Sequence, residues 1–186
     1  MGFYDNEETA RQYIAMAEGY DGRELIGILR NHLPDGSSVL ELGMGPGVDL
    51  SMLEQHFRAT GSDISQYFLD RYRETHADAD LLFLDATELQ TDRVFDCIYS
   101  NKVLHHLTDK ELATSLRRQK EVLAGDGMVM HSFWQGEGTQ EHHGLKFVYQ
   151  TEQSLRKIFG ETFSTVTVVS YTEMEDHDSL YVLATV

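Results

Sequence analysis

A short apolar run that ends in three closely spaced glycines constrains the fold of this chain more than any other feature. Residues 38–42 read SVLEL, which predicts a buried strand, and Gly43, Gly45 and Gly47 follow at once. Glycine lets the backbone turn sharply and approach a ligand without a Cβ collision. Residues 48–57 then show the apolar spacing of a helix. A strand, a glycine turn and a helix in this order predict a ligand site at the carboxyl end of a parallel strand.

The rest of the chain alternates between strand-like and helix-like segments. We expect Ser65 and Thr108 to be helix N-caps and Gly125 to stop a helix. Two short helices are expected within residues 13–33, and a loop at 135–150. The predicted strands are 38–42, 58–64, 80–86, 93–101, 127–134, 163–174 and 178–186, and the other predicted helices are 48–57, 65–76, 108–124 and 151–160.

This order of segments predicts an α/β fold. Strands separated by helices form parallel sheets with right-handed crossovers, and the helices cover both faces. The last two strands are joined by a segment too short for a crossover helix, so we expect them to pair antiparallel. The prediction is a doubly wound, Rossmann-like seven-stranded sheet, mostly parallel with a C-terminal antiparallel strand, and with helices on both faces.

Length and composition indicate a single domain. A chain of 186 residues with 41% apolar residues supports one sizeable core and is short for two. We assign residues 1–186 to one domain, with residues 1–33 as an N-terminal helical lid and residues 34–186 as the Rossmann-like core. No apolar run approaches the roughly 18 residues of a membrane span. The first residues are acidic and polar, unlike a signal peptide, so we expect a cytoplasmic location and no membrane partner.

The charge balance disfavours nucleic acid as a partner. The chain has 31 acidic and 15 basic residues, for a formal net charge of -16. Such a field repels phosphodiester backbones and anionic lipid surfaces. None of these features determines the oligomeric state.

Polar side chains at the predicted strand ends point to the ligand. Asp63 stands 20 residues after Gly43, where a ribose-binding carboxylate is expected. A nicotinamide dinucleotide fits poorly, because its G-x-G-x-x-G fingerprint needs glycine where this chain has Val48. Glu41 and Asp49 would also place negative charge beside a pyrophosphate. Carboxylates suit a cationic ligand, and we disfavour a nicotinamide oxidoreductase.

Several motifs together carry a family resemblance. The run ELGMGPG at residues 41–47 resembles the first motif of class I S-adenosylmethionine-dependent methyltransferases, an acid-x-G-x-G-x-G after the first strand. Asp63 resembles the acidic residue that ends the second strand, and Asp85-Ala86 the motif after the third. Residues 95–107, FDCIYSNKVLHHL, resemble the motif of the fourth strand. The resemblance extends in order over roughly residues 20–134 and implies that cofactor, with S-adenosylhomocysteine as product.

The resemblance implies a role for each strand end. Asp63 would accept hydrogen bonds from the ribose hydroxyls while Ile64 packs on the adenine, and Asp85 would accept from the adenine amino group. Tyr20 either covers the cofactor as part of the lid or packs in the core. The remaining residues implied in cofactor binding are Ala86 through its backbone, Glu41, Gly43, Gly45 and Gly47 at the methionine end, and Ser100 and Asn101 through the main chain.

Methyl transfer is an in-line displacement that depends mostly on alignment, and a base is needed only if the acceptor arrives protonated. The first candidates for this base are His105 and His106, and strand alternation does not decide which of them faces the site. Further histidines are His131, His142 and His143. Their spacing does not favour a metal site, and we predict none.

We expect a small-molecule acceptor, bound by the N-terminal helices of residues 1–33 and by the segment 131–150. Trp134, Phe147 and Tyr149 would line an aromatic pocket. The cationic or donor groups for an anionic acceptor would be Lys146, His142 and His143. The alternative is a solvent-exposed loop whose aromatic residues pack in the core. A second function class also stays open, a regulatory module that binds S-adenosylmethionine without catalysis.

Overall fold

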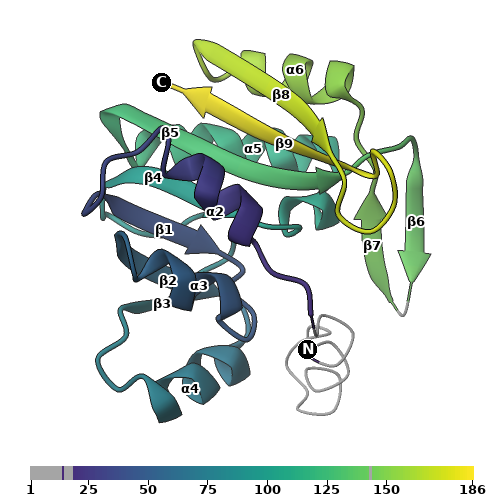
Figure 1. Cartoon of the computed structure of the whole chain (residues 1–186). Coiled ribbons are helices and arrows are strands. Elements are labelled where there is room, and N and C mark those ends of the chain that lie inside the picture. The colour runs from purple at the N-terminus through teal and green to yellow at the C-terminus, as the bar shows by residue number, and fades with distance from the viewer. Residues whose placement is uncertain (1–13, 15–18, 143) are drawn as a thin grey trace.

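A seven-stranded sheet forms the centre of the protein. The computed structural model describes residues 14, 19–142 and 144–186 (Figure 1). The strands of the sheet are β1 (Ser38–Leu42), β2 (Arg58–Asp63), β3 (Leu81–Phe83), β4 (Phe95–Ser100), β5 (Leu123–Trp134), β8 (Thr165–Tyr171) and β9 (Ser179–Thr185). Their order is β3-β2-β1-β4-β5-β9-β8, so the chain fills one half of the sheet and then crosses from β3 to β4 beside β1.

The sheet is mixed in the predicted way. Strands β1 to β5 pair parallel with one another. Strand β9 lies antiparallel between β5 and β8. The prediction of a doubly wound, mostly parallel seven-stranded sheet with an antiparallel strand at the C-terminus is therefore confirmed. The reversal of strand order places the carboxyl ends of β1 and β4 side by side, where ligands of such sheets bind.

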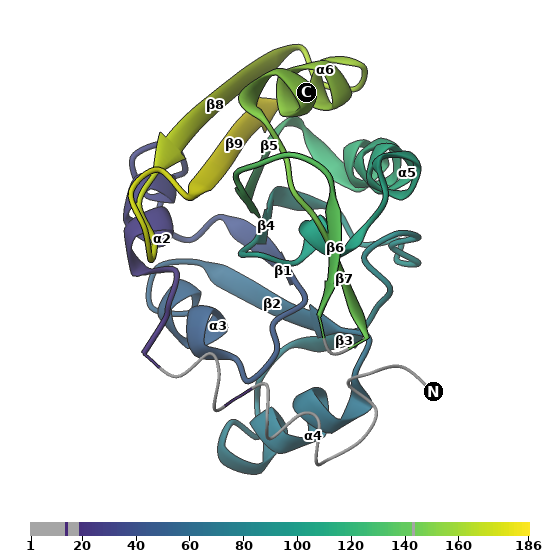
Figure 2. The same ribbon diagram turned by 90° about the vertical axis from the view of Figure 1, so that its right-hand side faces the viewer.

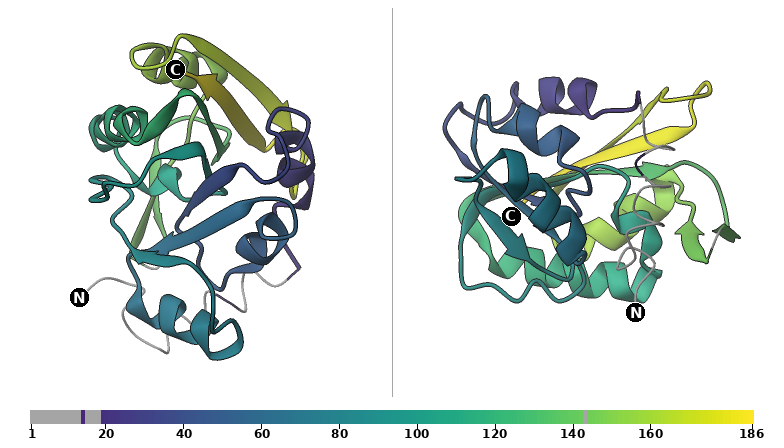
Figure 3. Two further views of the ribbon diagram at one scale, coloured as in Figure 1. Left: turned by 90° about the vertical axis from the view of Figure 1, so that its left-hand side faces the viewer. Right: turned by 90° about the horizontal axis from the view of Figure 1, so that it is seen from below.

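Helices cover both faces of the sheet, as predicted (Figure 3). One face carries α2 (Arg23–Leu29), α3 (Val48–Leu53) and α4 (Gln66–Thr75), which share an apolar cluster with the sheet. The other face carries α5 (Asp109–Glu121) and α6 (Glu152–Gly160), together with the short 3-10 helix η2 (Leu104–His106). Helices α4 and α5 begin where the sequence predicts. Ser65 is the N-cap of α4, and Thr108 forms a capping box with Glu111 at the start of α5.

The end of α5 differs from the prediction. The helix ends at Glu121, and β5 already begins at Leu123. Gly125 therefore lies inside a strand, and its assignment as a helix stop was wrong. Leu123 pairs with Phe95 of β4 and is buried. Burial of Leu123 against β4 favours the strand at this point over a further helical turn.

The segment 135–150 is not a plain loop. Strands β6 (Thr139–His142) and β7 (Leu145–Val148) pair antiparallel and form a separate two-stranded sheet. We call this unit the β6–β7 hairpin. In Figure 2 it lies in front of the main sheet, on the side of the carboxyl ends of the parallel strands, and β7 contacts η2. The prediction of a loop was wrong because a mostly polar hairpin lacks the apolar alternation that indicates a strand.

The second of the two predicted N-terminal helices is α2. Leu25, Ile26 and Leu29 are buried, so this helix belongs to the packed core. Apart from Ile14, which is helical, the first predicted helix lies outside the described residues. Among the helices that the structure describes, none is long and apolar enough to cross a membrane.

Candidate active site

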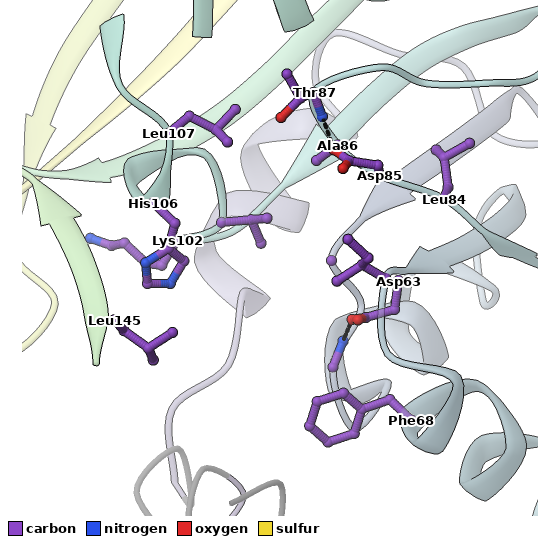
Figure 4. A pocket seen from close by; sticks show the side chains of 14 residues that line it. Asp63, Phe68, Leu84, Asp85, Ala86, Thr87, Lys102, His106, Leu107 and Leu145 are labelled. Atoms are coloured by element: carbon purple, nitrogen blue, oxygen red, sulfur yellow. Dashed lines mark hydrogen bonds between the residues drawn. The ribbon is translucent and has the colours of Figure 1, made fainter. Parts of the chain in front are cut away.

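A cavity of about 280 Å³ lies at the carboxyl ends of the parallel strands (Figure 4). It is bounded by the glycine loop after β1, by the ends of β2 and β3, by the segment after β4 and by the tip of the β6–β7 hairpin. Its lining consists of Gly43, Gly45, Asp63, Ile64, Phe68, Leu84, Asp85, Ala86, Thr87, Lys102, Val103, His106, Leu107 and Leu145.

The glycine loop leaves no room for a side chain at Gly43 or Gly47. Gly43, Gly45 and Gly47 have φ values of 65°, 51° and 83°, in the left-handed region. A Cβ on Gly43 would lie 2.6 Å from Cγ1 of Val103, and one on Gly47 would lie 2.3 Å from the ring of Tyr72. The loop is therefore held between two side chains and presents bare backbone to the cavity.

Asp63 shapes this loop as well as lining the cavity. Its Oδ2 accepts a hydrogen bond from Gly45 N at 2.9 Å, and its Oδ1 accepts one from Ser65 N at 2.8 Å. Burial raises the pKa of this carboxyl, while the backbone donors oppose that effect. The same carboxylate thus joins the end of β2 to the glycine loop and to the start of α4.

Glu41 is more deeply buried than the neighbouring carboxyl groups of Asp49 and Asp63. Its side chain is 3% exposed, and Oε2 has no hydrogen-bond partner among the described residues. Burial raises its pKa well above the ordinary value, and the carboxylates of Asp49, Asp63 and Glu54 raise it further. A cation bound beside Glu41 would relieve both the desolvation and the repulsion. The carboxylates around Glu41 therefore suit the ammonium and sulfonium groups of S-adenosylmethionine. They do not suit a phosphate, which is itself negatively charged.

Asp49 holds the neighbouring segments together. Its carboxylate accepts hydrogen bonds from Gly22 N at 2.7 Å, from the Tyr99 hydroxyl at 2.8 Å and from Asn101 Nδ2 at 3.2 Å. Burial raises the pKa of Asp49 despite these donors. In the sequence, Asp49 stands out only as a charge that would repel a pyrophosphate. Its partners lie 27 to 52 positions away, which no local pattern reveals.

The structure brings together about half of the predicted site residues. Gly43, Gly45, Asp63, Ile64, Asp85, Ala86 and His106 line the cavity. Glu41, Gly47 and Asn101 are absent from the lining, and the Ser100 hydroxyl is 2.8 Å from His131 Nδ1 in the core. Tyr20 is 45% exposed and is absent from the lining.

The two adjacent histidines have different surroundings. His106 lines the cavity, and its Nδ1 lies 2.6 Å from the carbonyl oxygen of Lys146. Because a carbonyl only accepts, Nδ1 carries the proton and Nε2 of the neutral ring is an acceptor. His105 is buried outside the lining and stacks on Phe147, with both ring nitrogens unpartnered among the described residues. Burial lowers the pKa of both histidines, so both are neutral near pH 7.

The other predicted acceptor residues do not line this cavity. The Trp134 ring lies under the ammonium group of Lys102, and the Tyr149 hydroxyl is 3.4 Å from Gln140 Oε1. His131 is fully buried, and burial lowers its pKa to about 3. His142 ends β6, and His143 lies outside the described residues. Within the described ranges, no group of three or more His, Cys, Asp or Glu residues could hold a metal ion.

Lys102 is the main residue that the sequence analysis missed. It lines the cavity with a positive φ of 54°, which is unusual for a residue with a side chain. Burial lowers the pKa of its ammonium group, and Glu173 opposes that effect. Its partners come from β5, β9 and the segment after β8, so only the tertiary structure reveals them.

Comparison with known proteins agrees with this geometry. Residues 39–127 match the family profile described as a methyltransferase domain. A curated protein of Geobacillus sp. (strain WCH70), named as an uncharacterized methyltransferase, is 33% identical over 135 residues. That alignment covers 66% of this chain and 63% of the relative, so the chain spans somewhat less than two thirds of the relative's length.

Solved structures share the fold at low sequence identity. A chain of the complex between the Haloferax volcanii Trm112 methyltransferase activator and a methyltransferase has a TM-score of 0.81 and 16% identity, covering 99% of this chain and 97% of that one. The 1,6-didemethyltoxoflavin-N1-methyltransferase of Burkholderia thailandensis, with bound 1,6-didemethyltoxoflavin and S-adenosylhomocysteine, has a TM-score of 0.72 and 21% identity, covering 100% and 91%. The profile match, the relative and the shared fold agree with the motifs at the strand ends, so residues 39–127 are similar to methyltransferase domains and the chain has the fold of the solved methyltransferases.

Proposed function

We propose that this protein transfers a methyl group from S-adenosylmethionine to a small-molecule acceptor and releases S-adenosylhomocysteine. The observation that carries the proposal is the buried carboxylate of Glu41, which has no described partner at Oε2, directly behind a glycine loop that faces a cavity. When bound, the cofactor supplies a methyl group that is already activated on a sulfonium, and transfer is an in-line displacement.

The lining residues divide into those that would hold the cofactor and those that would face the acceptor. On the cofactor side, Asp63 would bind the ribose and Ile64 and Asp85 the adenine, with Ala86 contributing backbone. The glycine loop and Glu41 would hold the methionine end, and the main chain near Ser100 and Asn101 would close it. The lid role is proposed for the segment before α2 that includes Tyr20, because α2 itself is packed in the core.

On the acceptor side, His106, Leu107 and Leu145 line the cavity where the β6–β7 hairpin approaches η2. We assign the role of general base to His106, since its Nε2 is an acceptor while Lys146 fixes Nδ1. The neutral imidazole suits removal of a proton near pH 7. His105 is the second candidate, and its place behind His106 gives it no direct approach to the cavity.

Two observations support an acceptor that is a small molecule. The net charge of -16 disfavours nucleic acid. The Burkholderia thailandensis neighbour is described as methylating 1,6-didemethyltoxoflavin, a small molecule.

Calorimetric titration tests the cofactor assignment. S-adenosylmethionine and S-adenosylhomocysteine are titrated into the wild type, Asp85→Ala and Asp92→Ala, where Asp92 is an exposed control outside the cavity lining. We expect saturable binding of both ligands to the wild type and the control, and at least tenfold weaker binding to Asp85→Ala. Failure of the folded wild type to bind either ligand would contradict the proposal.

Turnover separates an enzyme from a non-catalytic cofactor-binding module. We would measure formation of S-adenosylhomocysteine with a panel of small acids, amines, phenols and thiols. We expect turnover with at least one class, and a tenfold or larger loss of kcat in His106→Gln with unchanged S-adenosylhomocysteine affinity. Cofactor binding without turnover on any member of the panel would favour the regulatory module.

A further inference from the structure

The ammonium group of Lys102 is enclosed by groups from separate parts of the chain. Its Nζ lies 2.8 Å from Glu173 Oε2, donates a hydrogen bond to Ser179 Oγ at 2.6 Å and another to the Phe133 carbonyl at 3.2 Å. It also lies 3.6 Å from the centroid of the Trp134 ring. In Figure 4 the side chain runs away from Asp63 and leaves only its stem beside the cavity. The ammonium group thus has all of these partners within the protein and points away from the cavity.

The carboxylate that receives this ammonium group is itself fixed. Glu173 is 16% exposed at its side chain, and its Oε2 accepts a hydrogen bond from the Tyr171 hydroxyl at 2.9 Å. The backbone N–H of Glu173 donates to Asp178 Oδ1 at 2.9 Å. The segment between β8 and β9 therefore presents a preformed anionic group to the end of β4.

The backbone of Lys102 links this enclosure to the cavity wall. Its N–H donates to Ser132 Oγ at 2.9 Å, while its φ of 54° turns the chain sharply. The next residue, Val103, packs where a side chain on Gly43 would lie, since a Cβ there would be 2.6 Å from Val103 Cγ1. Val103 and the glycine loop form opposing sides of the same cavity.

A chain of hydrogen bonds connects the backbone of Lys102 to the carboxylate of Asp49. The Ser132 hydroxyl that receives the Lys102 N–H donates to Asn101 Oδ1 at 2.6 Å. Asn101 Nδ2 donates to Asp49 Oδ2 at 3.2 Å. Asp49 is one of the carboxylates that act on Glu41. The geometry after β4 therefore depends on both the backbone and the side chain of Lys102.

We propose that Lys102 is a positioning residue whose ammonium group, held by Glu173, Ser179 and Trp134, fixes Val103 against the glycine loop and so sets the affinity for the cofactor. The proposal rests on the cofactor site described above. A buried ion pair contributes little net stability compared with apolar packing, but removing one partner leaves the other buried and unpaired. The pair is therefore better suited to fixing a geometry than to strengthening the fold.

The test compares variants on both sides of the ion pair. Lys102→Met removes the charge and keeps the length of the stem, Glu173→Gln keeps the shape of the partner, and the double variant removes both charges. Lys110→Met, on the exposed face of α5, is the matched control. Affinity for S-adenosylhomocysteine is measured by calorimetry, KM for S-adenosylmethionine and kcat by turnover, and unfolding by thermal denaturation.

We expect Lys102→Met to bind S-adenosylhomocysteine at least tenfold more weakly than Lys110→Met and to raise KM more than it lowers kcat. Glu173→Gln should weaken binding three- to tenfold, and the double variant should be no worse than Lys102→Met, because both changes remove one interaction. A lower melting temperature with unchanged affinity in Lys102→Met would show a purely structural role and overturn the proposal.

Two further measurements keep the proposal separate from the proposed function. If Lys102→Met does not fold, Glu173→Gln decides alone, and wild-type affinity in that variant overturns the proposal. If the wild type itself binds neither ligand, the cofactor assignment fails. The positioning role is then read from hydrogen exchange of the Lys102 and Val103 amides in Glu173→Gln, where exchange as slow as in the wild type overturns it.

Discussion

Glu41 has an environment that should make the stability of the ligand-free protein fall with rising pH. Its folded pKa lies above the ordinary value of 4.5, first through burial and then through Asp49, Asp63 and Glu54. The folded protein therefore binds this proton more tightly than the unfolded chain does. The free energy of unfolding falls as the pH rises from about 4.5 through the folded pKa, and the loss is complete above it.

Glu41→Gln should remove this part of the pH dependence. We expect the ligand-free variant to melt at a higher temperature than the wild type at pH 8 and at nearly the same temperature at pH 4.5. It should also bind S-adenosylmethionine at least tenfold more weakly, because the charge that receives the cation is gone. Thermal denaturation from pH 4.5 to 8 checks this, with the exposed Glu74→Gln as control. A wild-type slope in Glu41→Gln would contradict the assignment of the dependence to Glu41.

Helix α2 is attached to the core through a contact that only glycine permits. A Cβ on Gly22 would lie 2.2 Å from Asp49 Oδ2 and 2.3 Å from the Tyr99 hydroxyl. Gly27, in the same helix, has nothing within 4 Å of its Cβ position. We expect Gly22→Ala to lower the free energy of unfolding by about 1–3 kcal/mol through overpacking. Gly27→Ala should raise it by roughly 0.5–1 kcal/mol, as alanine favours a helix.

Urea denaturation of the wild type and the two alanine variants measures these changes in the free energy of unfolding. Each variant is the control for the other, because both replace a glycine by alanine and differ only in the space around the new Cβ. Equal effects of the two substitutions would mean that the start of α2 is not held against Asp49. Cofactor affinity should fall in Gly22→Ala alone, since Asp49 also contacts Asn101 behind the cavity.

The segment between β8 and β9 is stabilised by one carboxylate. Asp178 accepts hydrogen bonds from the backbone N–H groups of Glu173, Met174 and Glu175. Burial opposes its ionisation, but these donors outweigh burial and lower its pKa to about 2. This stabilisation is present above the unfolded value of 3.8 and is lost as the pH falls through about 2.

Asp178→Asn should therefore lower the free energy of unfolding at pH 7 by about 1–2 kcal/mol. The difference from the wild type should shrink below pH 3.8 and vanish near pH 2. Chemical denaturation at a series of pH values measures it, and the exposed Asp176→Asn serves as control. A difference that persists unchanged to pH 2 would exclude the ionised carboxylate as its source.

The elements that sequence patterns predict are those with local signals. Strand β1, the glycine loop and the N-cap Thr108 each depend on neighbouring residues, and all were predicted correctly. The β6–β7 hairpin and the contacts of Lys102 have no such signal. Hairpin residues such as Gln140 and Glu141 pair through backbone atoms, and Lys102 is held by groups 31 to 77 positions away. Long-range contacts of this kind leave no periodicity in the sequence.

Across the whole protein, the excess of acidic groups should make stability depend on salt. With a net charge of -16, repulsion among surface carboxylates destabilises the compact state, and salt screens it. We expect the melting temperature at pH 7.5 to rise between about 0.02 and 0.5 M sodium chloride. Differential scanning calorimetry checks this, and a melting temperature that falls over this range would contradict it.

The β6–β7 hairpin is closed at its base independently of its tip. Gly136 N donates to the Gln150 carbonyl at 3.0 Å, and Gln150 N donates to the Trp134 carbonyl at 3.0 Å. The hairpin forms its own small sheet and contributes Leu145 to the cavity. Its tip can thus be exchanged for one of another length or composition while the base stays paired. The proposed function then predicts that exchanging the tip changes which acceptor is methylated, while the residues proposed to hold the methyl donor stay as they are.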